Sequence, residues 1–202
     1  METNGNTDMQ KLTRNDLFSL EQYAEARSEF RAKVMSHKKN RQVQIGDHVT
    51  LYFEDKLTMQ YQIQEMLRVE KIFEADGINE ELNAYNPLIP DGDNWKATFM
   101  IEYSDIEQRK EALARMIGIE KRVWVKVEGF DHVWAIADED LERDTEEKTS
   151  AVHFLRFQLT PEMVKAVKNG SNIGIGIEHQ AYCHQIDTVP ANIRGSLASD
   201  LA

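Results

Sequence analysis

The segment that most limits what this chain can fold into is residues 150–159, a strand-like run with large apolar side chains at both alternating sets of positions. Successive side chains of a β-strand point to opposite faces of its sheet. Val152 and Phe154 would face one way, whereas Leu155 and Phe157 would face the other way. A strand with one wet face would not need apolar residues on both. We therefore expect a central strand that is covered on both sides.

Helices and strands are mixed along the rest of the chain. Apolar residues at helical spacing predict helices over about 15–37 and 57–75, and alternating residues predict hairpins over 42–54 and 122–137. The further predicted elements are a helix over 79–85, a strand over 95–103, helices over 104–118 and 160–170, a strand over 172–178 and a short helix near 191–197 in an otherwise irregular end. This order favours an α+β fold with a mostly antiparallel sheet and packed helices.

The length of 202 residues suits a single domain, which we place at residues 13–202 behind a disordered tail at residues 1–12. No run approaches the roughly 18 apolar residues that span a membrane, and residues 1–12 carry no signal-peptide core. Cys183 is the only cysteine, so no intrachain disulfide can form and a reducing compartment suits the chain. We expect a cytoplasmic protein that does not bind membranes.

The formal net charge of −11 argues against nucleic-acid binding, which needs positive charge. The charge is unevenly distributed: residues 27–41 hold six Lys or Arg against one acid, and residues 138–148 hold seven acids against two bases. Lys38, Lys39 and Arg41 are therefore a candidate partner surface, and the opposite charges could also support a homo-oligomer. The alternative is that both runs are solvated faces.

The predicted helix that begins at residue 57 carries polar side chains beside its apolar stripe. They are Gln60, Gln62, Gln64, Glu65 and Arg68. Long polar side chains next to a packed stripe need hydrogen-bond partners, because an unpaired buried polar group costs about 1–3 kcal/mol. We expect Glu65 and Arg68 to be partly buried and to contact residues outside their own helix.

A candidate polar site combines this helix with neighbouring strands, and it consists of His48, Glu54, Glu65, Arg68 and His153. His48 and Glu54 share the polar face of one predicted strand, and His153 could be a metal ligand or a general base tuned by burial. The alternative is that these residues are structural. Glu65 would then pair with Arg68 within a hydrogen-bond network, and His153 would be a core histidine that is hydrogen-bonded to a neighbour.

A second candidate site is metal-binding. His179, Cys183 and His184 lie within six residues and could hold zinc or a softer metal, although their spacing matches no zinc-finger pattern. The alternative is a solvent-facing tail. Gly174 and Gly176 alternate with isoleucine, which indicates close backbone packing in a strand rather than a phosphate loop. No nucleophile motif is present, so the chain is not assigned as an enzyme. The sequence identifies no cofactor, which stays unknown.

Three blocks carry a resemblance to a known family: EDKLTMQYQIQEMLR at residues 54–68, NPLIPDG at 86–92 and KTSAVHFLR at 148–156. Here the chain resembles the uncharacterised bacterial proteins of domain-of-unknown-function family 3501, from about residue 11 to the end. That family has no established activity and no assigned site residues to transfer. Its members are described beside rubrerythrin-like and heterodisulfide-reductase-like iron–sulfur proteins, which implies a redox partner in oxidative-stress physiology. The paired Glu-x-x-His motifs of di-iron bundles are absent, so the chain is not itself a rubrerythrin.

Two functional hypotheses follow. The favoured one is a non-catalytic accessory or binding protein that works with a rubrerythrin-like or iron–sulfur partner, because no motif supplies chemistry and the charge is segregated. The alternative is a metal-dependent enzyme, or a metal or redox sensor, that uses the His and Glu cluster.

Overall fold

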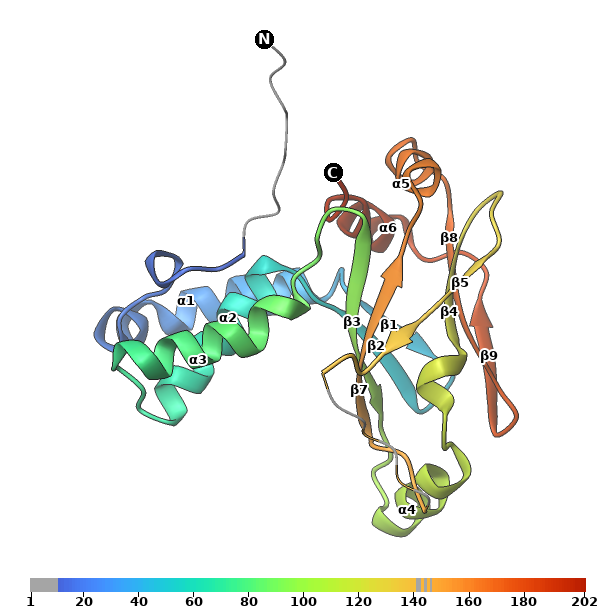
Figure 1. The fold of residues 1–202 in the computed structure, drawn as a ribbon, viewed down its shortest axis with the longest axis horizontal. Helices are drawn as coiled ribbons and strands as arrows, with labels where there is room; N and C mark the ends of the chain where they lie inside the picture. The colour runs from blue at the N-terminus through green and yellow to red at the C-terminus, as the bar shows by residue number, and fades with distance from the viewer. Residues whose placement is uncertain (1–10, 141–142, 144, 146) are drawn as a thin grey trace.

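Two antiparallel sheets pack face to face, and three helices project from one side of them (Figure 1). The computed structural model describes residues 11–140, 143, 145 and 147–202. The expected α+β architecture with antiparallel sheets and packed helices is confirmed. Below, the two sheets are called the sandwich.

The first sheet contains the segment from which the sequence analysis began. Its strands, in spatial order, are β1 (Gln42–Ile45), β2 (Val49–Phe53), β3 (Asn94–Ile101), β7 (Val152–Gln158) and β6 (Ile136–Ala137). His153 lies on β7 between β3 and β6 and is fully buried, so its expected place on an inner strand is confirmed. Leu155 and Phe157 face the sandwich core, whereas Phe154 on the opposite face is only half-buried.

The second sheet has the spatial order β5 (His132–Trp134), β4 (Val123–Val127), β8 (Ile173–His179) and β9 (Tyr182–Ile186). The predicted hairpin over 122–137 divides at its end, because β6 leaves this sheet and pairs with β7. The expectation of an irregular segment after residue 179 is wrong for β9. That strand pairs antiparallel with β8. Its three middle side chains, Cys183, His184 and Gln185, are all exposed, so the strand lacks an alternation of apolar and polar residues.

The helical arm is the projecting part of the fold, and it has its own apolar core. It consists of η1 (Arg14–Asp16), α1 (Leu20–Lys38), α2 (Lys56–Val69), α3 (Ala75–Tyr85) and η2 (Asn86–Leu88). Six of its buried apolar residues form a cluster separate from the sandwich core, and they are Leu12, Met59, Ile63, Leu67, Leu82 and Ile89. Tyr23 and Val34 of α1 are also buried. The single domain therefore holds two cores.

The helix predicted over 57–75 ends earlier than expected. Lys71 adopts a φ of 55°, a left-handed conformation that stops α2, and Ile72 N donates to Leu67 O at 2.9 Å. A new helix, α3, then begins at Ala75. Asp76 and Gly77, which directly follow the predicted helix over 57–75, lie inside α3.

The start of the described chain is attached to the arm. Lys11 Nζ donates to Ile89 O at 2.7 Å, and Leu12 N donates to the side chain of Asn86 at 2.8 Å. Leu12 is buried. Residues 1–10 of the expected tail lie outside the described residues, but residues 11 and 12 belong to the folded arm because Leu12 completes its core.

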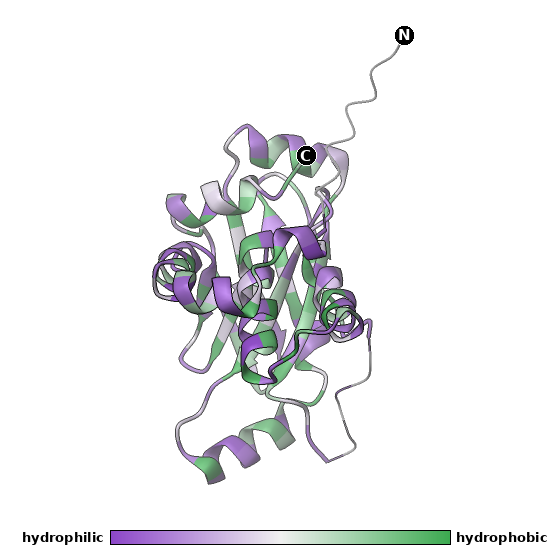
Figure 2. Ribbon diagram, turned by 90° about the vertical axis from the view of Figure 1, so that its left-hand side faces the viewer, coloured by the Kyte–Doolittle hydropathy of each residue, from purple (hydrophilic) through white to green (hydrophobic). Residues whose placement is uncertain are grey.

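Short helices close the ends of the sandwich: α4 (Ile106–Arg115), η3 (Ile119–Arg122), α5 (Pro161–Lys168) and α6 (Ala191–Ala198). Figure 2 views the molecule from the side of the arm and shows helices with both hydrophilic and hydrophobic residues in front of the strands. Within the described residues, no helix combines the length and apolar character that crossing a membrane requires.

The acidic run at 138–148 is partly outside the described residues, at positions 141, 142, 144 and 146. In its described part, Asp138 and Asp140 pair with Arg143 at 2.9 and 2.7 Å, and Glu139 pairs with Arg156 at 2.8 Å. These acids are therefore engaged within the protein.

Candidate functional site

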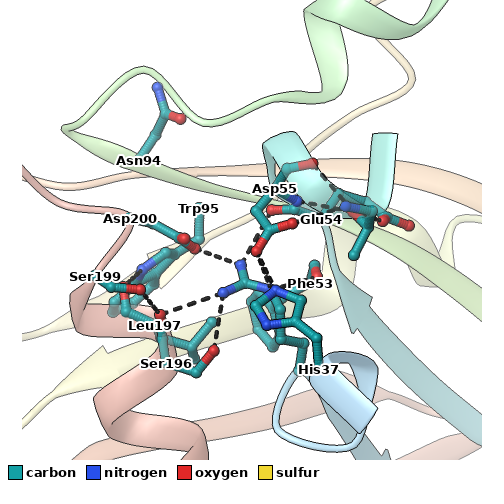
Figure 3. Close-up of polar contacts among 12 residues, drawn as sticks. His37, Phe53, Glu54, Asp55, Asn94, Trp95, Ser196, Leu197, Ser199 and Asp200 are labelled. Carbon is teal, nitrogen blue, oxygen red and sulfur yellow. Dashed lines mark hydrogen bonds and ion pairs between the residues drawn. The ribbon is translucent and has the colours of Figure 1, made fainter. Parts of the chain in front are cut away.

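A polar cluster with a buried centre surrounds Arg41, where the arm meets the sandwich (Figure 3). The Arg41 side chain is 1% exposed. Its Nε donates to Phe53 O at 2.9 Å, and its Nη1 donates to the carbonyl and hydroxyl oxygens of Ser196 at 3.2 and 3.0 Å. Its Nη2 donates to Glu54 O at 3.1 Å and to Asp200 Oδ2 at 2.5 Å.

These contacts use all five N–H groups of the guanidinium. Arg41 therefore has no donor left for a ligand. Our expectation that Arg41 belongs to a partner surface is corrected, because its side chain is buried and donates to Phe53 O at the end of β2, to Ser196 in α6 and to Asp200. Lys39 is exposed and Lys38 is half-buried over the Tyr61 ring at 5.8 Å, so these two keep their candidate role.

Asp55 extends the Arg41 cluster into the arm. Its Oδ1 caps α2 by accepting from Thr58 N at 2.9 Å, and its Oδ2 lies 2.5 Å from His37 Nε2 and 3.3 Å from Arg41 Nε. Burial raises the pKa of Asp200 to about 6, against the opposing effect of Arg41. The cluster joins the end of α1, the start of α2 and α6, so its geometry is that of a structural joint.

Glu65, from the candidate polar site, lies inside the arm. Its carboxylate accepts from Arg27 at 2.8 and 2.9 Å and from the Tyr23 hydroxyl at 2.7 Å. The hydrogen bonds from Arg27, and then the one from Tyr23, lower the pKa of Glu65 to about 2 despite partial burial. The expectation for Glu65 is confirmed. It is wrong for Arg68, which is exposed because it lies in the last turn of α2 on the outer side of the helix.

The other members of that candidate site lie elsewhere. Glu54 is buried and accepts from the hydroxyls of Thr58 and Thr98 at 2.6 and 2.7 Å. His48 stacks on Tyr103 with ring centroids 3.8 Å apart. His153 Nδ1 lies 2.6 Å from Asp138 Oδ2, and its Nε2 lies 2.8 Å from the hydroxyl of Thr149. The structure does not bring the five residues together: His48, Glu54, Glu65 and His153 each contact other neighbours, and Arg68 is exposed.

The candidate metal ligands at 179–184 lie on the β8–β9 hairpin. Both ring nitrogens of His179 contact backbone groups, with Nε2 at 3.1 Å from Ile117 O and Nδ1 accepting from Ala181 N at 3.2 Å. Cys183 is exposed, and the His184 ring lies against Tyr182. Among the residues that the structure describes, no three His, Cys, Asp or Glu side chains are grouped as metal ligands.

An apolar groove at the far end of the arm was not found from the sequence. We call it the tip groove; its volume is about 590 Å³, and its apolar lining residues are Leu17, Phe18, Leu20, Leu67, Ile72, Phe73 and Ile78. Phe73 is 73% exposed, and Val69, the last residue of α2, is 63% exposed. The predicted helix over 57–75 includes Phe73. The break at Lys71 instead turns Ile72 toward the arm core and leaves Phe73 in solvent.

Comparisons with other proteins identify relatives, and these relatives are described as proteins of unknown function. A family model described as "Protein of unknown function (DUF3501)" matches residues 11–201. A crystal structure of a novel protein of unknown function from Burkholderia pseudomallei K96243 is 53% identical, covers 96% of this chain and 100% of its own, and superposes with a TM-score of 0.91. No curated protein matches the chain.

Proposed function

The chain belongs to the DUF3501 family of proteins of unknown function, and we propose that it is a non-catalytic binding protein that docks a protein partner on the tip groove. The observation that carries this proposal is the exposure of Phe73 in the lining of an apolar groove, together with the exposure of Val69 at the end of α2. A large aromatic side chain in water gains about 1.5–3 kcal/mol on full burial. Aromatic anchors of this kind dominate the energetics of protein interfaces.

The position of the tip groove suits docking. It lies at the end of the arm that is farthest from the sandwich, so the sheets do not cover it (Figure 1). By contrast, the polar clusters at Arg41 and Glu65 direct their charged groups at other parts of this chain. The geometry thus supports binding more than it supports catalysis.

We propose that the partner presents an apolar side chain to the tip groove and acidic groups to Lys38 and Lys39, which lie at the other end of α1. The partner class that we propose is a rubrerythrin-like or iron–sulfur protein, and this rests on the association of the family with such proteins. We propose the cytoplasm as the compartment, on the single cysteine.

The experiment compares capture of partners by the wild-type chain and by the variant Val69→Ser/Phe73→Ser. Proteins retained by the wild type from the native lysate are identified, purified and titrated against each form. We expect the double variant to bind at least tenfold more weakly, because a lost aromatic anchor removes about 2 kcal/mol or more. Its melting temperature should be unchanged, since both side chains already lie in solvent.

Ile106→Ser is the matched control, because Ile106 is 58% exposed on α4 and outside the groove. It should bind as the wild type does. Lys38→Glu/Lys39→Glu should weaken binding at low salt and little at high salt, since exposed charges are screened within about 8 Å at physiological ionic strength. Equal binding by the wild type and the Val69/Phe73 variant would overturn the proposed docking site.

A further inference from the structure

The outward face of the first sheet is covered in part by the arm. The sequence of β7 predicts cover on both faces of that strand, but Phe154, on its outward face, is half-buried. The helix α3 ends beside this face (Figure 1). There Lys96 Nζ on β3 donates to Pro87 O of η2 at 2.7 Å, which ties the end of the arm to the sheet.

A cavity of about 470 Å³ lies at this junction, and we call it the junction cavity. Its arm side includes Ala84 and Tyr85 of α3 and Pro87 and Leu88 of η2, and its sheet side includes Phe154 of β7. The volume is within the range for small-molecule sites, which is about 300–1,000 Å³. The two parts of the molecule thus enclose a space of ligand size between them.

The cations that line the junction cavity, Lys96 and Arg156, have partners within the chain. Arg156 Nε and Nη2 donate to the two carboxylate oxygens of Glu139 at 2.9 and 2.8 Å, and these hydrogen bonds lower the pKa of Glu139. Lys96 Nζ lies 2.8 Å from Asp91 Oδ2, and the Lys96 side chain is 11% exposed. An anionic ligand would have to displace these carboxylates to reach either cation.

The acids in the lining, Glu139 and Asp140, are paired in the same way. Asp140 accepts from Nη1 and Nη2 of Arg143 at 2.7 Å each, and Glu139 is held by Arg156. The Arg143 Cζ also lies 4.7 Å from the centroid of the Phe154 ring. A cationic ligand would therefore have to compete with guanidinium groups that are already in place.

The uncharged part of the lining is largely apolar, and it includes Ala84, Pro87, Leu88, Phe154 and the ring of Tyr85. Displacing water from apolar surface is favourable. Bringing a charge into such a space is unfavourable unless the charge gains a partner, and the charged groups of this lining already have theirs. The lining thus favours a ligand that is apolar and uncharged.

We propose that the junction cavity binds a small, uncharged molecule with an apolar body, which packs between Leu88 of the arm and Phe154 of the sheet. This ligand contacts the arm and the sandwich at the same time. The junction cavity shares no lining residue with the tip groove, so the site is independent of the proposed docking role of the arm.

The test uses the full chain with ¹³C-labelled leucine methyl groups, and cyclohexanol is the probe. The Leu88 signals are identified as those lost in Leu88→Ile. They should move along a saturable curve as cyclohexanol is added, because the probe packs against this side chain. The signals of Leu197, which is buried in the sandwich core away from the junction cavity, should move little.

Two charged analogues, cyclohexanecarboxylate and cyclohexylammonium, test the chemical class of the ligand. Each has the same ring, with the charged group attached directly to it. The ring therefore cannot enter the junction cavity without bringing its charge close to groups that are already paired. We expect both analogues to bind roughly tenfold more weakly than cyclohexanol, or weaker still.

The variant Ala84→Trp tests the position of the site, because Ala84 is exposed on α3 and the larger side chain reduces the space in the junction cavity. We expect it to bind cyclohexanol roughly tenfold more weakly. Ala32→Trp, at an exposed position of α1 outside the lining, is the matched control and should bind as the wild type does. Thermal melting checks that both variants fold.

Three results would each overturn the proposal. The Leu88 signals could fail to saturate, or either charged analogue could bind as tightly as cyclohexanol. Folded Ala84→Trp could also give the wild-type curve. The series of analogues uses the wild-type chain, so it decides the proposal even if Ala84→Trp does not fold.

Discussion

At the level of single residues, Glu65 couples ionisation to the folding of the arm. Its pKa is lowered to about 2 in the folded state from an ordinary value of 4.5, so its contribution to stability is present above pH 4.5 and is lost as the pH falls toward 2. We predict that Glu65→Gln lowers the free energy of unfolding by about 1 kcal/mol at pH 7, since the pair with Arg27 is partly exposed. The difference from the wild type should shrink at pH 3.

Urea unfolding at pH 7 and pH 3 measures this difference. Glu29→Gln is the control, because Glu29 is exposed on the same helix as Arg27 and should change stability by less than about 0.5 kcal/mol at both pH values. A constant difference between Glu65→Gln and the wild type across this pH range would contradict the assignment of Glu65 as a carboxylate stabilised by folding.

The sequence predicted which side chains of a helix need partners, but not which residues those partners are: the partners of Glu65, Arg27 and Tyr23, are 38 and 42 residues away on another helix. Glu65 was predicted as a buried contact from the pattern of α2. Arg41 was grouped with Lys38 and Lys39, because a run of basic residues gives no sign of which one is buried. Its carboxylate partner, Asp200, is 159 residues away, and only the folded topology brings the two together.

At the level of elements, the break between α2 and α3 creates the tip groove, and Lys71 is the residue at the break. A non-glycine residue in the left-handed region is strained by about 1 kcal/mol. We predict that Lys71→Gly stabilises the protein by about 0.5 kcal/mol, because relief of this strain exceeds the added entropy of the unfolded chain. Lys33→Gly, in the middle of α1, should instead destabilise it by about 1 kcal/mol.

Urea unfolding of both variants measures the sign of each change in the free energy of unfolding. If Lys71→Gly destabilised the protein as much as Lys33→Gly does, the α2–α3 break would not be a left-handed turn. The sequence predicted helix across this break because the apolar spacing continues through it, and no glycine or proline marks the stop. Strand β9 was missed for a related reason, since an edge strand with polar side chains lacks the alternation on which strand prediction depends.

At the level of the whole molecule, the arm and the sandwich have separate apolar cores, and the Arg41 cluster joins α1 and α2 of the arm to β2 and α6 of the sandwich. The chain supplies separate probes for them. The helices of the arm, α1 to α3, hold 19, 14 and 11 residues, against 10, 8 and 8 in α4 to α6, so far-UV circular dichroism reports mainly on the arm. All three tryptophans, Trp95, Trp124 and Trp134, lie on sandwich strands, so their fluorescence reports on the sandwich.

We predict that the two probes give coincident urea unfolding curves for the wild type and separate curves for Arg41→Met. Removing one partner of a buried ion pair destabilises a protein by about 3–5 kcal/mol, and this loss falls where the arm joins the sandwich. The arm has the smaller core, so its circular dichroism signal should be lost at lower urea than the fluorescence signal.

The control is Lys39→Met, because Lys39 is exposed and only two residues from Arg41. This variant should leave the two curves coincident. Coincident curves for Arg41→Met would mean that other contacts couple the arm to the sandwich, and the Arg41 cluster would then be a buried network without a coupling role.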